Sequence, residues 1–185
     1  RRARRLRQGR ADPHHRRRRP VSPARRQGVE ASFSAGLARN LRFIASYTHL
    51  QASFRTPFLT CVAAGCPAPD TPVQAGTRIP GVSRSTGYAA LKYGGERGWQ
   101  AGLDMNAMGA TSVNDLGTES APGYALFGVS GGYVFDQGPW RVNTFARVDN
   151  LADRHVIGSV IVNDGNGRYY EPAPGRTFLV GVDVR

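Results

Sequence analysis

Two segments in the last third of this chain alternate between apolar and polar residues, and this alternation restricts the possible folds. They are Trp140–Asp149 and Arg176–Arg185. The even positions of the first segment are mostly apolar: Trp140, Val142, Thr144, Ala146 and Val148. Its odd positions are mostly polar or charged: Arg141, Asn143, Phe145, Arg147 and Asp149. Because successive side chains of a β-strand point to opposite faces, this period of two predicts strands with one apolar and one charged face.

The same alternation of apolar and polar residues continues through most of the chain. From Val29 onward, alternating stretches are separated by turn residues. We expect seven strands, at about 29–38, 41–54, 85–94, 98–109, 123–135, 140–149 and 176–185. Strands of about ten residues are long enough to cross a bilayer when tilted. No run of about 18 apolar residues is present, so no membrane-spanning helix is predicted.

The expected connections alternate between short and long. The short ones are 39–40, 95–97 and 136–139, and the long ones are about 55–84, 110–122 and 150–174. This alternation is typical of an up-and-down transmembrane barrel with tight periplasmic turns and long outer loops. The sequence therefore predicts an all-β, antiparallel segment of a transmembrane barrel. The last strand follows a long loop, so it should end on the periplasmic side.

The strongly basic charge of the chain belongs to its first residues. Residues 1–26 hold twelve Arg and one Asp, whereas the other 159 residues hold thirteen Lys or Arg and twelve Asp or Glu. A segment this charged, without apolar periodicity, cannot bury enough surface to fold alone. We therefore divide the chain into an Arg-rich disordered tail at 1–28 and a barrel portion at 29–185.

Three interpretations of this tail are open. It is a solvated disordered segment, an arm that binds nucleic-acid phosphates, or sequence foreign to the barrel. We prefer the third for much of residues 1–24, as the misread or frame-shifted start of a truncated gene. Because the rest of the chain is nearly neutral, any nucleic-acid binding should be nonspecific attraction to phosphates, so no specific nucleic-acid partner is expected.

No set of residues points to catalysis, a cofactor or a metal. The four histidines, at positions 14, 15, 49 and 155, are scattered, and no Ser–His–Asp, paired-carboxylate or metal-ligand spacing stands out. The oxygen-rich segment Asn163–Gly167 resembles a calcium loop but lacks the later Glu. We interpret this segment as a turn, and we expect the protein not to be an enzyme.

The two cysteines enclose four residues in the longest expected loop. An even number of cysteines in a surface loop of an exported protein favours a disulfide between Cys61 and Cys66. Two free thiols are an alternative. A metal site is a weaker one, because no histidine lies in the loop.

The two faces of the expected strands carry different side chains. We predict that six aromatic residues lie at the membrane interfaces, where amphipathic rings are stable: Tyr47, Tyr93, Trp99, Tyr133, Phe135 and Trp140. Their strand propensity alone is the alternative explanation. Near the midplane, lipid contact costs about 2–4 kcal/mol for Arg or Lys. Six charged residues should therefore face the lumen: Lys92, Asp104, Arg141, Arg147, Asp149 and Asp183.

Two motifs lie between the last two expected strands. Asn150-Leu-x-Asp153 follows the penultimate strand, and Glu171-Pro-x-Pro-Gly-Arg176 leads into the last one. With the strands beside them, these motifs resemble the C-terminal end of TonB-dependent outer-membrane receptors. Four shorter stretches are similar to patterns of this family and follow in the right order: 26–30, 45–48, 78–81 and 121–124.

The resemblance implies a function and a set of partners. Receptors of this family lie in the bacterial outer membrane and take up a scarce nutrient, most often a ferric siderophore. Their barrels have about 22 strands around an N-terminal plug, and the TonB complex supplies energy through that plug. Here we expect seven strands without a plug or an energy-coupling box, and the chain stops at Arg185, where the family usually ends on an aromatic residue. The chain should therefore contact outer-membrane lipid, the remaining strands and a plug. A truncated remnant without transport is the alternative.

Overall fold

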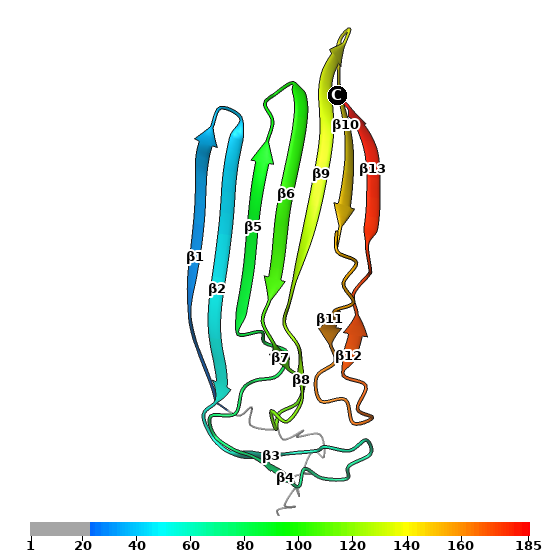
Figure 1. The fold of residues 1–185 in the computed structure, drawn as a ribbon. Coiled ribbons are helices and arrows are strands. Elements are labelled where there is room, and N and C mark those ends of the chain that lie inside the picture. Colours follow the sequence, from blue (N-terminus) through cyan, green and yellow to red (C-terminus); the bar gives the residue numbers. More distant parts are fainter. Residues whose placement is uncertain (1–22) are drawn as a thin grey trace, which may run out of the picture.

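The structure, a computed structural model, describes residues 23–185. Seven long strands form one antiparallel sheet in chain order (Figure 1). They are β1 (Ala24–Ala38), β2 (Leu41–Phe54), β5 (Ser85–Tyr93), β6 (Gly98–Met108), β9 (Tyr124–Gln137), β10 (Trp140–Asp149) and β13 (Thr177–Val184). The predicted all-β, up-and-down arrangement is confirmed. Within residues 23–185 no helix has the length and apolarity needed to cross a membrane.

The first strand begins earlier than the sequence predicts. β1 starts at Ala24, and residues 24–28 pair with the far end of β2, from Ala24 opposite Phe54 to Gly28 opposite Leu50. In the sequence analysis, residues 24–28 are assigned to the charged tail instead. Ladder hydrogen bonds join backbone groups and do not require apolar side chains, so the arginines obscured the strand. Residues 1–22, which hold the rest of the predicted tail, lie outside the described residues.

Short turns and long connections lie at opposite ends of the sheet (Figure 1). The turns between β1 and β2 and between β9 and β10 contain Asn40 and Gly138, whose positive φ angles of 62° and 59° suit tight hairpins. The long connections carry three small ladders: β3 (Phe58–Thr60) with β4 (Thr71–Val73), β7 (Thr111–Ser112) with β8 (Ser120–Ala121), and β11 (Ile157–Val160) with β12 (Tyr170–Pro172). The C-terminus lies at the end of the short turns, as predicted (Figure 1).

Strand register separates the side chains into two faces. One row across the sheet consists of Ala35, Phe43, Leu91, Leu103, Val129, Val148 and Phe178. The adjacent row, on the other side, consists of Gly36, Arg42, Lys92, Gly102, Ser130, Arg147 and Leu179. We call the side of the first row the apolar face and the side of the second row the polar face.

The strands are staggered relative to one another, and the sheet is open. In the second row, Arg42 is the second residue of β2, whereas Ser130 lies well inside β9, which continues to Gln137. Such a stagger accompanies the tilt that strands need in a barrel wall. Within the described residues, β1 and β13 are the edges, each paired on one side only.

The sheet has little core of its own. Large side chains of the apolar face are exposed, including Trp99 at 74% and Val180 at 77%. The largest fully buried side chains of the described residues are Val73 and Val113, and both belong to the long connections. The apolar face of the strands is therefore exposed to the surroundings of the sheet and is not covered by the protein itself.

Candidate functional site: the polar face and the long loops

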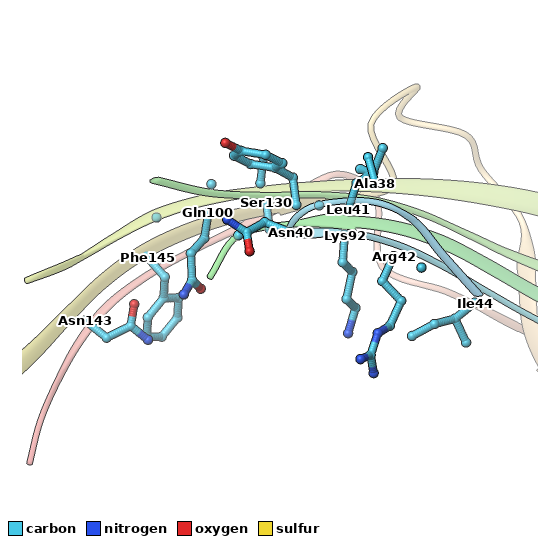
Figure 2. Close-up of a pocket in the computed structure, with 17 residues that line it drawn as sticks. Ala38, Asn40, Leu41, Arg42, Ile44, Lys92, Gln100, Ser130, Asn143 and Phe145 are labelled. Carbon is cyan, nitrogen blue, oxygen red and sulfur yellow. The ribbon is translucent and has the colours of Figure 1, made fainter. Parts of the chain in front are cut away.

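A hollow of about 730 Å³ lies on the polar face, close to the short turns. Glycines from three strands form part of its floor: Gly36, Gly102 and Gly132. Figure 2 shows the long side chains of Arg42, Lys92, Gln100 and Asn143 pointing to the concave side of the sheet. Small residues thus leave room between long polar side chains.

An ion cluster spans three strands of the polar face. Arg147 on β10 donates two hydrogen bonds to the carboxylate of Asp104 on β6, at 2.8 and 3.0 Å, and a third to Asp149 at 2.9 Å. Asp104 is only 8% exposed. The guanidinium reaches across β9 because Gly128 has no side chain there; a Cβ at that position would lie 2.9 Å from Nη2 of Arg147. Such paired charge-assisted bonds fix the geometry of both partners.

One aromatic side chain lies among these polar residues. Phe145 on β10 is opposite Gly132 on β9 and Gly181 on β13. A Cβ at Gly181 would lie 2.5 Å from the ring of Phe145. The ring therefore covers the glycine of a neighbouring strand, which explains an aromatic residue on this face.

All six charged residues that the sequence assigned to the lumen lie on the polar face. Besides the Arg147 cluster, Asp136 pairs with Arg97 and lies 3.5 Å from Nε of Arg141. Asp183 pairs with Arg185 at 2.9 Å. Lys92 lies directly opposite Arg42, and neither cation has an ion-pair partner among residues 23–185. That this face lines a lumen stays a prediction.

The six aromatic residues assigned to the membrane interfaces lie on the apolar face. Five of them lie towards the short turns: Tyr93, Trp99, Tyr133, Phe135 and Trp140. Three are in ring contact, with centroid distances of 5.0 Å for Trp99 and Tyr133 and 6.1 Å for Tyr133 and Phe135. Tyr47 lies farther towards the long loops, where its hydroxyl is 3.1 Å from Oγ of Ser85.

The longest loop contains a disulfide. Cys61 and Cys66 are bonded, with Cα atoms 5.8 Å apart. This loop also contacts the last loop, because the amide of Ala64 donates a 3.2 Å hydrogen bond to the carbonyl of Gly165. A side chain at Gly165 would clash with the backbone of Ala64, so the contact requires glycine.

The middle loop joins the other two. The hydroxyl of Thr60 donates to the carboxylate of Asp115 at 3.2 Å, and the amide of Asp115 donates to the side chain of Asn163 at 2.9 Å. The segment that includes Asn163 is a turn, in which Asp164 accepts a 2.7 Å hydrogen bond from the amide of Arg168. Sequence reasoning did not predict these contacts between loops.

A second hollow lies beside the last loop, at the end of the sheet away from the short turns. Its volume is about 440 Å³, and its lining includes Tyr124, Arg154, His155 and Tyr170. The hydroxyl of Tyr170 donates a 3.0 Å hydrogen bond to the carboxylate of Glu119. Desolvation and, after it, this hydrogen bond raise the pKa of Tyr170 above its ordinary value. The sequence pattern gave no sign of this hollow, because its lining comes from segments far apart in the chain.

Comparisons with known proteins agree with this architecture. The family "TonB dependent receptor-like, beta-barrel" matches residues 8–151. The match thus begins within the Arg-rich segment and ends before the Glu171–Arg176 motif.

Solved structures of a receptor and of two transporters have a similar fold. The siderophore receptor PiuA from Acinetobacter baumannii is 16% identical, with a TM-score of 0.72 over 88% of this chain and 22% of its own. The ferric citrate transporter FecA is 18% identical, with a TM-score of 0.69 over 88% of this chain and 24% of its own. The copper transporter OprC is 20% identical, with a TM-score of 0.62 over 87% of this chain and 23% of its own.

This chain thus spans about a quarter or less of the length of each of these three proteins. The family match, in contrast, covers most of the chain, from residue 8 to residue 151. The chain therefore belongs to the family of TonB-dependent receptor-like β-barrels.

Proposed function

We propose that this chain forms part of the barrel wall of an outer-membrane receptor that takes up a metal chelate, and we propose a ferric siderophore as that chelate. The observation that carries the proposal is the separation of the predicted lumen charges from the apolar middle row across the seven strands. The middle row of the apolar face is apolar from Ala35 to Phe178, whereas the six predicted lumen charges all lie on the other face.

Lipid is the environment that suits this separation. The apolar face exposes large side chains, including Phe178 at 73% and Val182 at 65%, and a water-exposed patch of this kind marks a contact surface. Trp99, Tyr133 and Trp140 lie towards the short turns, where a girdle at the periplasmic interface would place them. The outer membrane is therefore the proposed location, with the short turns on its periplasmic side.

The outer loops support a role in ligand capture. They are joined by hydrogen bonds and closed at one tip by the Cys61–Cys66 disulfide. The hollow beside the last loop offers tyrosines and Arg154, which suit an anionic, aromatic chelate. PiuA is a siderophore receptor, FecA a ferric citrate transporter and OprC a copper transporter, so metal chelates are the proposed substrate class.

The open edges of the sheet define the remaining partners. In lipid, the unpaired backbone groups of β1 and β13 would be costly, because each unsatisfied N–H or C=O group costs several kcal/mol, on the order of 2–7. The proposed receptor therefore supplies further strands to both edges, a plug on the polar face and, through the plug, contact with the TonB complex. Without such strands, the same chain would be a barrel remnant without transport, which is the second candidate function.

Uptake by the native bacterium distinguishes these two functions. The gene is deleted, and uptake of radiolabelled ferric siderophores and of copper is measured under limitation of each metal. We expect the protein in the outer-membrane fraction and the loss of one uptake activity, restored by the intact gene. An unchanged set of uptake rates, with the protein still in the outer membrane, favours the remnant. Recovery in the water-soluble fraction would contradict both.

A further inference from the structure

We propose that a row of basic residues, where the apolar face meets the long connections, binds the phosphate headgroup of an anionic lipid. This arginine row consists of Arg25 on β1, Ser53 on β2 and Arg78, which follows β4. Arg25 lies opposite Ser53, and Ser53 in turn forms a β-bridge with Arg78. β1 begins and β2 ends at this end of the sheet (Figure 1). Because neighbouring strands lie about 4.8 Å apart, the backbones of the two arginines are about 10 Å apart, with a small side chain between them.

The apolar face becomes polar in steps towards this row. Along β1, the residues on this face are Phe33, Ala31, Val29, Gln27 and Arg25. At a rise of about 3.4 Å per residue, Arg25 lies about 13 Å beyond Val29 along the strand. For a strand tilted by about 40°, this is about 10 Å along the membrane normal, which leads from the hydrocarbon core into the headgroup layer. The arginine row therefore lies at headgroup depth in the proposed membrane, and in this respect the inference rests on the proposed function.

No carboxylate within residues 23–185 neutralises the arginine row. Neither of its arginines forms an ion pair there. The only acidic residue of β1, Glu30, alternates with Val29 and therefore lies on the polar face. Burial and, after it, the charge of Arg84 lower the pKa of Arg78 below its ordinary value. A third guanidinium thus adds to the positive potential of the row, and an anion from outside the sheet would relieve the repulsion.

Charge and continuity with the apolar face identify the occupant as a phosphorylated lipid. Guanidinium groups bind phosphate through paired, charge-assisted hydrogen bonds, and the hydroxyl of Ser53 is a further donor between them. The acyl chains of such a lipid would lie along the adjoining apolar face, where Val29 and Phe33 are 69% and 58% exposed. A free anion has no use for this apolar surface, so the two parts of the site together select a lipid.

Two adjacent arginines of β1 provide a matched pair of variants. Arg25 and Arg26 are both exposed, but Arg26 lies opposite Ala52 and belongs to the polar face. The protein is purified from outer membranes in a nonionic detergent and titrated with phosphatidic acid or with diacylglycerol of the same acyl chains. Native mass spectrometry counts the bound lipids, and we expect phosphatidic acid to bind in preference to diacylglycerol. Arg25→Gln and Arg78→Gln should each weaken this binding roughly fivefold, equivalent to about 1 kcal/mol, whereas Arg26→Gln should leave it unchanged.

Three results would overturn the inference. The first is equal binding of phosphatidic acid and diacylglycerol. The second is an equal loss of binding in Arg25→Gln and Arg26→Gln, which would indicate attraction to the overall positive charge. The third is displacement of the lipid by millimolar inorganic phosphate, which would indicate a site for small anions. Arg25→Lys keeps the charge and should retain most of the binding, which separates loss of the site from loss of the fold. If uptake persists in the outer membrane but any of the three results is obtained, the inference fails and the proposed function stands.

Discussion

The strands and the long loops of this protein are stabilised by different surroundings. The strands leave Val180 and Trp99 about three-quarters exposed, at 77% and 74%, whereas the loops bury Val73 and Val113 almost completely, at 1% and 0%. The loops also carry the disulfide and the hydrogen bonds between segments. The loops thus bury apolar side chains and pair polar groups within the protein. The strands bury little within the protein, so each of their faces needs a suitable environment outside it.

The largest expected effect tests whether the two faces of the strands lie in different environments. Met105 and Asn106 are adjacent on β6 but lie on the apolar and the polar face, respectively. In a lipid-embedded barrel, Met105→Arg should lower the free energy of unfolding by about 2–4 kcal/mol. The matched variant Asn106→Arg should change it by less than about 1 kcal/mol, because the new side chain lies on the polar face. Urea unfolding in lipid vesicles, followed by tryptophan fluorescence, measures both; equal effects would contradict the assignment of faces.

A smaller effect is expected at the ion cluster of the polar face. Asp104→Ala removes two hydrogen bonds from Arg147 and should cost about 1–3 kcal/mol, since Asp104 is nearly buried. Asp183→Ala breaks a pair with the exposed Arg185 and should cost less than about 1 kcal/mol. The same unfolding measurement compares them. If Asp183→Ala and Asp104→Ala cost the same, the paired hydrogen bonds between Arg147 and Asp104 across Gly128 contribute no extra stability.

The disulfide should affect the loops and leave the sheet unchanged. Closing so short a loop restricts the unfolded chain by about 2 kcal/mol at most. The double variant Cys61→Ser with Cys66→Ser should therefore increase protease cleavage in residues 55–84, while the unfolding midpoint of the strands stays constant. Reduction of the unmodified protein should reproduce this result. A large shift of the strand midpoint would show that the loops and the sheet unfold together.

The smallest expected effect is a pH dependence at Tyr170. Its pKa is raised in the folded protein, so folding favours the neutral phenol. The associated stabilisation is complete below the ordinary pKa of about 10 and is lost as the pH rises through the raised value. Ultraviolet titration of tyrosinate should show one group that ionises late. Glu119→Gln should bring this group back towards its ordinary range, and the absence of any change would remove the role of the Glu119 hydrogen bond.

Alternation along the chain predicted most of the sheet. A period of two is a property of a single strand, so it predicts Trp140–Asp149 and the other strands without information on their partners. Alternation does not predict the extension of β1 to Ala24, because this segment pairs with β2 through its backbone and its side chains include Arg25 and Arg26. A local pattern indicates which side chains lie on each face of a strand. It does not indicate how far a strand extends along its neighbour.

The candidate site was less predictable than the sheet. Charges on the polar face were expected, but the bridge from Arg147 to Asp104 depends on the glycine at 128, between strands far apart in sequence. The contact between Ala64 and Gly165 is likewise long-range. Neither produces a local sequence signal, so both required the three-dimensional structure.

The central claim is that lipid covers the apolar face, and a spin-label scan of β6 tests it most directly. Single cysteines are introduced at positions 98–108 of a variant without Cys61 and Cys66, and the labelled protein is measured in lipid vesicles. At 101, 103, 105 and 107, the account predicts high accessibility to oxygen, which concentrates in the bilayer, and low accessibility to a water-soluble nickel reagent. Labels at these positions that are shielded from both reagents would instead place the apolar face in a protein core and contradict the account.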